Sequence, residues 1–494
     1  MTPELSPLKR QLFLLIVFVF FVTVQSIVAQ PVLYFPSEEI VENKYFREKV
    51  IESQKKEKAR ISGFTKKQVN LINEQIDYRI DLLLSLMTSG EILFDSPLQK
   101  YVEAVFYKLL KANPVIDQSY QVIVSRSSVP NAFNVGGGFI IINTGLIERL
   151  QSEEELAFIL AHELSHQVMD HVNQNIAENV IAETDKVRKE QIKKILQSRY
   201  RVYSQLENLI LPGLTNEMSF RRSLELQADS LGLVYYLNSA YSNLGPLQTM
   251  LLLDRIDIDE DTTLIDYRSF FKSDSILFNP RWLKYGTASS LSGVVAPIDT
   301  LSDVLRTHPD ALYRFDVLKN ILQLPGIDTT AGPPLNQAFD QIRILARIET
   351  IHGLFLGGSY SKAIHAALKT SVLHPELEYP KFITSIMLSR LNKMRIEKKA
   401  GLYLDTTNKN YAETYNRTIS FLWEINSKDC AQIAYWLVRP ANPSTNRFQM
   451  EALLYSAMVV DRKKEFRSLF SLYKRSFPET AQTAEFAAYL DTSK

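Results

Sequence analysis

The chain has 494 residues, of which 46% are hydrophobic and 22% are charged. This length predicts two or three domains, and the composition excludes collagen-like, low-complexity and wholly disordered proteins. A formal net charge of +1 creates no strong field, so we expect no nucleic-acid function. The single cysteine, Cys430, excludes an intrachain disulfide and any cysteine-based zinc module, so a metal would need histidine and carboxylate ligands.

The first 30 residues follow the three-part plan of a secretory signal. Lys9 and Arg10 precede an apolar run over residues 12–24, and a short small and polar stretch follows it. We predict that residues 1–30 form a cleaved signal peptide and that the mature protein is periplasmic or secreted. An uncleaved N-terminal membrane anchor is the alternative; otherwise we expect only peripheral contact with a membrane.

A charged N-terminal arm is predicted over residues 31–67, as a solvated helix or a mobile segment, because Glu, Lys and Arg dominate there. The folded domain is expected to start near Gln68 and to extend to residue 324. Apolar residues at helical spacing predict two helices between residues 69 and 110. Two short β-branched runs, at residues 120–125 and 139–143, are joined by a turn-rich stretch and predict a hairpin-like sheet element.

A buried helix is predicted after Ser152, which forms a capping box with Glu155 and is followed by a continuous apolar stripe. Further helices are expected over residues 173–207 and 218–237. Regular spacing is lost between residues 257 and 304, where we predict a lid or an insertion that contacts substrate.

A linker is predicted at residues 325–334, which are rich in Gly and Pro, and an all-helical domain is predicted at residues 335–494. The spacing of Gly358, Tyr360, Ala363, Ile364, Leu373 and Pro375 is typical of the second helix of a tetratricopeptide repeat, with a weaker echo at residues 466–478. An irregular helical domain is the alternative. The predicted fold class is α+β: a mostly helical domain with a small β-sheet, followed by an all-α, repeat-like domain.

Three of the seven histidines lie within ten residues, at positions 162, 166 and 171. Positions four apart share a helix face, so His162 and His166 can direct both imidazoles at one metal ion, with Glu163 beside an open coordination position. The alternative, two core histidines, would leave buried polar groups unpaired. His171 points away from that face, so we expect it to support the site or lie on the surface.

A third ligand is predicted downstream, where Glu225 and Asp229 lie four residues apart on one helical face. Glu225 would bind the metal, and Asp229 would orient a ligand histidine. Small Ala228 between them permits close approach to the helix that carries the histidines. The alternative is a solvated acidic face.

Together these motifs resemble the zinc metallopeptidase family that includes the integral-membrane HtpX and the periplasmic BepA-like proteases. The resemblance rests on Asn131-Ala132-Phe133, on the His162 to His171 stretch, on Arg222-x-x-Glu225-x-x-Ala228-Asp229-x-x-Gly232, and on Thr307-His308-Pro309 with Arg314. It implies a zincin-type peptidase domain that holds one Zn²⁺ per chain. It also implies a C-terminal helical domain that docks substrate or an envelope assembly complex.

The expected reaction is hydrolysis of peptide bonds in misfolded or misassembled envelope or secreted proteins. Zinc held by His162, His166 and Glu225 would bind a water molecule, and Glu163 would take its proton as general base. The resemblance makes Asp229 a further catalytic residue, either as a proton donor or as the carboxylate that orients a histidine. The alternative function is a chaperone or adaptor of envelope protein assembly that uses a latent protease fold.

Two further groups of residues are expected near the reaction. The resemblance implies that His308 acts as a latch on the open metal position or stabilises an oxyanion together with Arg314, whereas a purely structural His308 is the alternative. An extended substrate is expected to pair with the strand that follows the glycine turn, by strand addition. The residues predicted for this substrate contact are Gly137, Gly138, Phe139 and Ile141.

Overall fold

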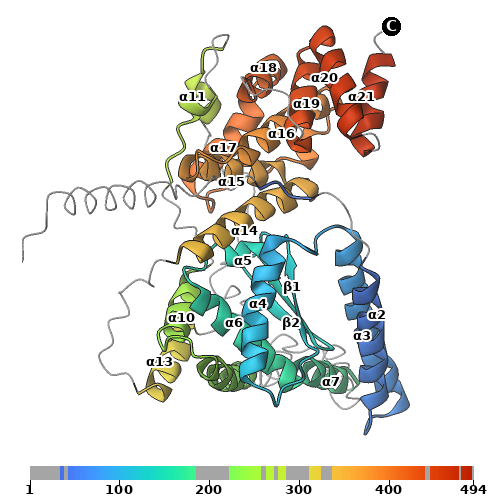
Figure 1. Ribbon diagram of the computed structural model, residues 1–494, viewed down its shortest axis with the longest axis vertical. Helices are drawn as coiled ribbons and strands as arrows, with labels where there is room; N and C mark the ends of the chain where they lie inside the picture. Colours follow the sequence, from blue (N-terminus) through green and yellow to red (C-terminus); the bar gives the residue numbers. More distant parts are fainter. Residues whose placement is uncertain are drawn as a thin grey trace, which may run out of the picture.

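The described residues form two lobes, with helix α14 between them (Figure 1). The computed structural model describes residues 34–37, 43–184, 222–256, 263–271, 276–284, 311–323, 336–439, 446–477 and 480–491. The predicted signal peptide and the predicted linker lie outside these residues. Among the residues described, no helix is both long enough and apolar enough to span a membrane.

Within the part of the chain that the structure describes, the sheet of the first lobe has three strands, in the order β1-β3-β2. Strands β1 (Gln121–Ser125) and β3 (Phe139–Asn143) are parallel, and β2 (Ala132–Gly136) pairs antiparallel with β3. The predicted hairpin between the two β-branched runs is therefore wrong. The stretch that we interpreted as a long turn contains β2, so the hairpin joins β2 to β3 across Gly137 and Gly138.

Both faces of this sheet are covered by helices. Alternate residues of β1 and β3, such as Val122 and Ile140, pack with α4 (Pro97–Ala112) and α6 (Glu153–Val168). Their neighbours Ile123 and Ile141 pack on the opposite side, with α2 (Lys44–Arg60), α3 (Lys66–Thr88) and α7 (His171–Thr184). Because successive side chains of a strand point to opposite faces, a sheet covered on both sides reads as an unbroken apolar run, as in β3.

We predicted that the folded lobe starts near Gln68. Helix α2 shows that it starts earlier in the sequence. Phe46 and Val50 are buried against the sheet, and the ring of Phe46 packs edge-on against Phe139. Two apolar residues are enough to dock a helix whose other faces are charged, which is why its composition predicted a solvated arm.

The second lobe is entirely helical in the residues described, and α14 belongs to both lobes. Its first half, including Phe339 and Leu345, packs in the core of the first lobe, whereas Ile351 and Phe355 pack in the second. The predicted fold class is confirmed. The helices of the second lobe are α14 (Gln337–Leu356), α15 (Tyr360–Leu373), α16 (Tyr379–Ile396), η3 (Ala400–Leu402), α17 (Glu413–Glu424), α18 (Ser427–Leu437), α19 (Arg447–Val459), α20 (Lys463–Ser476) and α21 (Ala481–Asp491).

The two segments that suggested a helical repeat are α15 and α20, and each follows another helix across the same kind of turn. The backbone N–H groups of Ser359 and Arg462 bond to the carbonyls of Leu354 and Ala457, five residues earlier. This bond typifies a Schellman turn, which ends a helix. The assignment to the tetratricopeptide class stays a prediction.

The described parts of the predicted insertion at residues 257–304 lie against the second lobe. Helix α11 (Tyr267–Phe270) and the turn η1 (Pro280–Leu283) contribute Tyr267 and Trp282 to its core. The hydroxyl of Tyr267 donates a hydrogen bond to the carbonyl of Thr414 at 3.0 Å. The prediction of a lid over the site therefore concerns only the remaining residues of this stretch, which lie outside those described.

Candidate metal centre

Helix α6 carries three of the predicted site residues. Ser152 caps its N-terminus, with its hydroxyl accepting the N–H of Glu155, and the helix is then buried on nearly every side. His162 and Glu163 are 5% and 3% exposed, so their polar groups must be satisfied within the protein or by a ligand. Because α6 is so deeply buried, its side chains are held in fixed positions, as a catalytic site requires.

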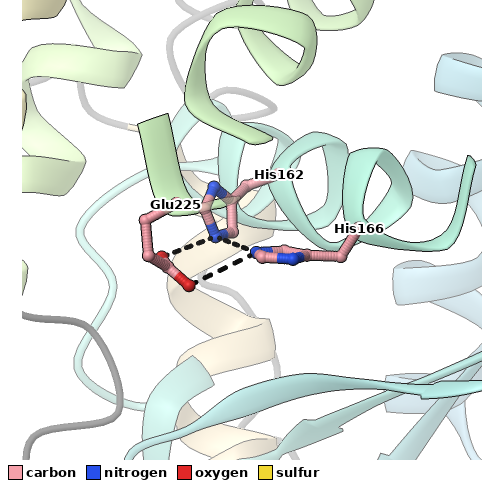
Figure 2. A group of neighbouring side chains, drawn as sticks. All are labelled: His162, His166 and Glu225. Carbon is pink, nitrogen blue, oxygen red and sulfur yellow. Dashed lines mark hydrogen bonds and ion pairs between the residues drawn. The ribbon is translucent and has the colours of Figure 1, made fainter. Parts of the chain in front are cut away.

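His162, His166 and Glu225 converge on one point (Figure 2). The Nε2 atoms of the two histidines are 3.1 Å apart, and they lie 3.4 and 3.5 Å from the carboxylate oxygens of Glu225. Zinc with ligands at about 2.0–2.2 Å in tetrahedral geometry separates its ligand atoms by about 3.3–3.6 Å. His162 contacts Oε2 of Glu225 and His166 contacts Oε1, so the three groups gather around one point at separations close to these values.

Glu225 reaches this point from the helix over residues 222–238, which packs closely on α6. A Cβ atom added at Gly232 would lie 3.0 Å from the Cα of His162, so a larger residue there would press the two helices apart. Ala228, which is fully buried, lies one turn earlier. The sequence predicted close approach from Ala228, and Gly232 makes the tighter contact.

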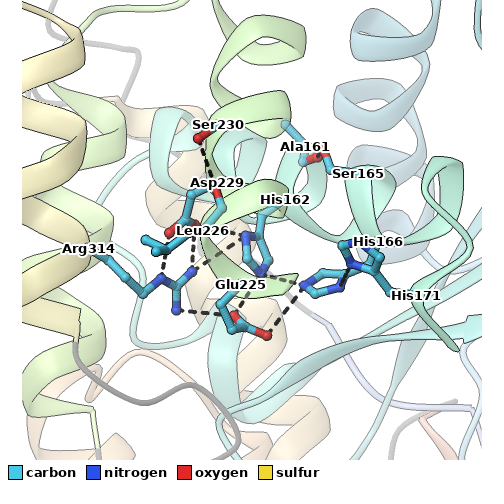
Figure 3. A network of polar contacts seen from close by, with 10 residues as sticks. All are labelled: Ala161, His162, Ser165, His166, His171, Glu225, Leu226, Asp229, Ser230 and Arg314. Carbon is cyan, nitrogen blue, oxygen red and sulfur yellow. Dashed lines mark hydrogen bonds and ion pairs between the residues drawn. The ribbon is translucent and has the colours of Figure 1, made fainter. Parts of the chain in front are cut away.

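A carboxylate contacts the Nδ1 side of the His162 ring, and a guanidinium binds this carboxylate (Figure 3). The Nδ1 of His162 is 3.0 Å from Asp229 Oδ1, and Arg314 of α13 (Ala311–Ile321) donates two hydrogen bonds of 2.6 Å to the same carboxylate. Arg314 also lies 3.4 Å from Glu225. Arg314 therefore positions the two site carboxylates; because it also lines the cavity, its predicted contact with an oxyanion stays a prediction.

His166 has a different partner. The Nδ1 atom of His171 lies 2.8 Å from the Nδ1 of His166, and His171 itself is buried at the start of α7. We predicted that His171 either supports the site or lies on the surface. In the structure it supports the site. The predicted latch, His308, lies outside the described residues.

The electrostatics of the site favour a cation. Burial disfavours a charged imidazole, but the hydrogen bonds to Asp229 and Glu225 outweigh it and raise the pKa of His162 to about 10. Burial likewise opposes ionisation of Asp229, yet Arg314 and His162 lower its pKa to about 2. Asp229 is thus ionised at neutral pH, so of its two predicted roles the geometry favours orienting His162 over donating a proton.

The predicted substrate strand is not available. Strand β3 lies in the middle of the sheet, its five residues are buried, and both of its edges are already paired. The glycine turn before it is covered by α2, where the Ser53 hydroxyl donates a hydrogen bond of 2.8 Å to the carbonyl of Gly137. Gly137, Gly138, Phe139 and Ile141 therefore do not contact substrate by strand addition, because that requires a free edge.

A cavity opens beside the metal-binding residues. His162, Glu163 and Arg314 line it, together with Asn131 and with Ala132 at the start of β2. β2 is an edge strand of the described sheet, in contrast to β3. The sequence interpretation missed β2 because it is short and lies between Pro130 and three glycines, two strong turn signals.

Comparisons with known proteins agree with this geometry. Residues 96–322 match the sequence model of Peptidase family M48. The chain is 30% identical over 130 residues to mitochondrial metalloendopeptidase OMA1 of Arabidopsis thaliana, covering 25% of this chain and 23% of that protein. It is 27% identical over 165 residues to OMA1 of Schizosaccharomyces pombe, covering 33% and 45%. It is 30% identical over 88 residues to the beta-barrel assembly-enhancing protease of Yersinia pestis, covering 18% of each. The matches span less than half of each relative.

Proposed function

From the match of residues 96–322 to Peptidase family M48, we propose that the chain is an endopeptidase of this family that uses one zinc ion. The observation that carries the proposal is the convergence of three groups on one point: the Nε2 atoms of His162 and His166 are 3.1 Å apart and lie 3.4 Å from Oε2 and 3.5 Å from Oε1 of Glu225, respectively. These separations are close to those between neighbouring ligands of a tetrahedral zinc ion, and three protein ligands leave a fourth position for water. Catalytic zinc sites in proteins keep such an open position, whereas structural ones are closed.

Zinc would supply a Lewis acid that polarises the peptide carbonyl and makes water more acidic. Glu163 lines the same cavity as His162 and is buried, so its carboxylate can take a proton from the attacking water and return it to the leaving amine. Asp229 and Arg314 keep His162 in the tautomer that presents Nε2 to the metal.

We propose that an extended substrate adds to the edge of β2. Ala132, the first residue of this strand, lines the cavity beside Glu163. Strand addition uses backbone hydrogen bonds, so it accepts many sequences and suits an enzyme that degrades unfolded segments. Substrate preference would then depend on the pockets for individual side chains.

We further propose that the substrates are envelope or secreted proteins. The apolar N-terminal segment has the pattern of a secretory signal, and one relative is named as a protease that enhances β-barrel assembly. The second lobe, with its antiparallel helices, would dock a partner complex or the substrate.

The test combines metal content with proteolysis on the same samples. We expect near one zinc per wild-type chain by elemental mass spectrometry, and degradation of casein. Glu163→Gln should keep the zinc and abolish degradation, whereas Glu225→Ala should lose both. Ser230→Ala, at an exposed position on the same helix as Glu225, is the control and should change neither. Wild-type protein without zinc would contradict the proposal, and zinc without proteolysis would favour the chaperone or adaptor function.

A further inference from the structure

The cavity beside the metal centre has a second, apolar wall. Apart from the site residues and residues 130–132, its lining comes from α5 (Thr144–Ile147), α6, α10 (Gly245–Arg255) and the residue after it, and the start of α13. The side chains of this wall are aliphatic or aromatic: Leu146, Phe158, Ile159, Met250, Leu253, Ile256 and Ala311. A cavity with this lining would favour an apolar occupant, because water gains few hydrogen bonds there.

This apolar wall begins next to the reacting groups. Ile159 precedes Glu163 by four residues on α6, so the two side chains share a face of the helix and are separated by about one turn, roughly 5.4 Å. An extended peptide advances about 3.3 Å per residue. The side chain next to the scissile bond is therefore within reach of the apolar wall when the carbonyl lies at the metal.

We propose that this cavity binds the side chain of one of the two residues that flank the scissile bond, and that it selects a large apolar side chain such as Leu, Met or Phe. The inference rests on the proposed function, because it assumes that a peptide is cleaved at the metal. It adds a substrate class to the backbone recognition by β2, which by itself gives little sequence preference.

The polar residues of the lining do not point to a charged occupant. The Thr249 hydroxyl is buried and donates a hydrogen bond of 2.8 Å to the carbonyl of Gly245 within its own helix. Asp254 is half-buried and contributes one carboxylate to the lining. A lysine or arginine side chain would have to lose its water against the apolar wall for a single ion pair, which is unfavourable.

The first experiment maps cleavage sites. Wild-type protein is incubated with a peptide library that is randomised on both sides of a central bond, and products are identified by mass spectrometry. We expect Leu, Met or Phe to be enriched at one flanking position by at least about tenfold over Asp, Lys and Gly, as the burial of one such side chain would give.

A pair of variants tests the cavity itself. Ala311→Phe would fill it from α13, so cleavage next to Leu or Phe should fall at least about tenfold while cleavage next to Ala is retained. Leu312→Phe is the matched control, because Leu312 is 53% exposed, is not among the cavity residues and receives the same side chain. Zinc content and circular dichroism should be unchanged in both variants.

Binding without cleavage gives an independent readout. In the Glu163→Gln background, a dye-labelled peptide with Leu at the mapped position should bind at least about tenfold more tightly than its Asp counterpart, measured by fluorescence anisotropy. Adding Ala311→Phe should remove this difference. Cleavage without apolar preference would overturn only this inference, and enrichment of Lys or Arg would assign the cavity to Asp254 instead. A wild-type chain that holds zinc and cleaves no peptide would overturn both the inference and the proposed function.

Discussion

At the scale of single residues, the two metal-binding histidines are held by partners of different chemistry. His162 Nδ1 lies against the carboxylate of Asp229, which only accepts, so its proton is fixed on Nδ1. His166 Nδ1 lies 2.8 Å from His171 Nδ1, and one of these two nitrogens must donate. When Nε2 of His166 faces a metal, its proton is on Nδ1, so His171 accepts with Nδ1 and carries its own proton on Nε2.

This tautomer argument predicts that His171 supports zinc binding without touching the metal. His171→Ala should weaken zinc affinity by about 10–100-fold, because His166 loses the group that orients its ring. His171→Asn, which can keep a hydrogen-bonding atom near the position of Nδ1, should recover part of the loss. The measurement is competition with a zinc chelator.

The control for this prediction is His374→Ala, which removes a partly exposed histidine of the second lobe. If His171→Ala binds zinc as tightly as this control, then the contact with His166 has no role in the metal site.

Spacing along helices predicted the ligands, but not what holds them. His162 and His166, or Glu225 and Asp229, are four residues apart, and helical periodicity is a local rule that a sequence reveals. The pairing of Arg314 with Asp229 joins residues 85 positions apart. No local rule gives the orientation of such a guanidinium, which is why the sequence did not predict that Arg314 positions Asp229.

At the scale of elements, the N-terminus of α6 contains a buried acid. The Glu155 carboxylate accepts the backbone N–H of Gln151 at 2.6 Å, and the residue is 2% exposed. Burial outweighs this hydrogen bond and the positive charge of Arg343, and it raises the pKa of Glu155 from its ordinary value of 4.5 to about 7. The folded protein thus holds a proton here that the unfolded chain releases at lower pH.

Stability should therefore fall as pH rises from about 4.5 through about 7, because the folded state must then either keep its proton or bury a charge. Glu155→Gln keeps an oxygen that can accept the Gln151 N–H and removes the charge. We expect it to raise the free energy of unfolding at pH 8 by on the order of 2–3 kcal/mol.

At pH 5 the same variant should be close to wild type, since Glu155 is then mostly protonated in the folded protein. Urea unfolding of both proteins at the two pH values measures this. Equal stabilisation at pH 5 and pH 8 would show that the effect is not one of charge.

Secondary structure was predicted correctly where a segment contains its own helix-start signal. The prediction failed where strands far apart in the sequence pair with each other. The cap at Ser152 and the apolar stripe after it are local, so α6 was predicted. Whether β1 meets β3 in parallel depends on where β2 lies, and β2 is only five residues long. Local spacing also cannot tell that charged α2 docks on the sheet, because only Phe46, Val50 and Glu57 of its residues are buried.

At the scale of the whole molecule, a buried ion pair joins the two lobes. Arg126, just after β1, donates a hydrogen bond of 2.7 Å from Nε to Glu349 of α14, whose side chain is fully buried. Tyr34 donates to the same carboxylate, and the carbonyl of Ser37 accepts from Arg126 at 2.8 Å. The segment before α2 thus lies across the junction, where Phe35 packs on Phe448 of the second lobe.

The ion pair between Arg126 and Glu349 therefore helps to fix the position of the second lobe relative to the first. α14 also contacts α5, which belongs to the metal-binding lobe, and the Thr350 hydroxyl donates a hydrogen bond to that of Thr144 at 2.9 Å. The sequence predicted a domain boundary near Leu335 from glycine and proline, and it could not reveal that the helix after this boundary is shared. A helix shared by two cores couples their unfolding, because neither core is complete without it.

Glu349→Ala should therefore destabilise the molecule strongly, since it leaves Arg126 buried without its carboxylate. We expect a loss of about 3–5 kcal/mol in the free energy of unfolding, and a single thermal transition should separate into two as the lobes uncouple. The measurement is differential scanning calorimetry. Glu413→Ala, which breaks an exposed ion pair with Arg417, is the control and should leave one transition near the wild-type temperature.

Replacing both partners separates the burial of charge from the loss of packing. Arg126→Met combined with Glu349→Leu removes both charges and keeps apolar volume, so much of the stability lost in Glu349→Ala should return, together with a single transition. A double variant as unstable as the single one would mean that the hydrogen bonds of Arg126 to Gly90 and Ser37, and not the ion pair, hold the junction. A Glu349→Ala protein with the stability of the exposed control would contradict the coupling of the lobes through this pair.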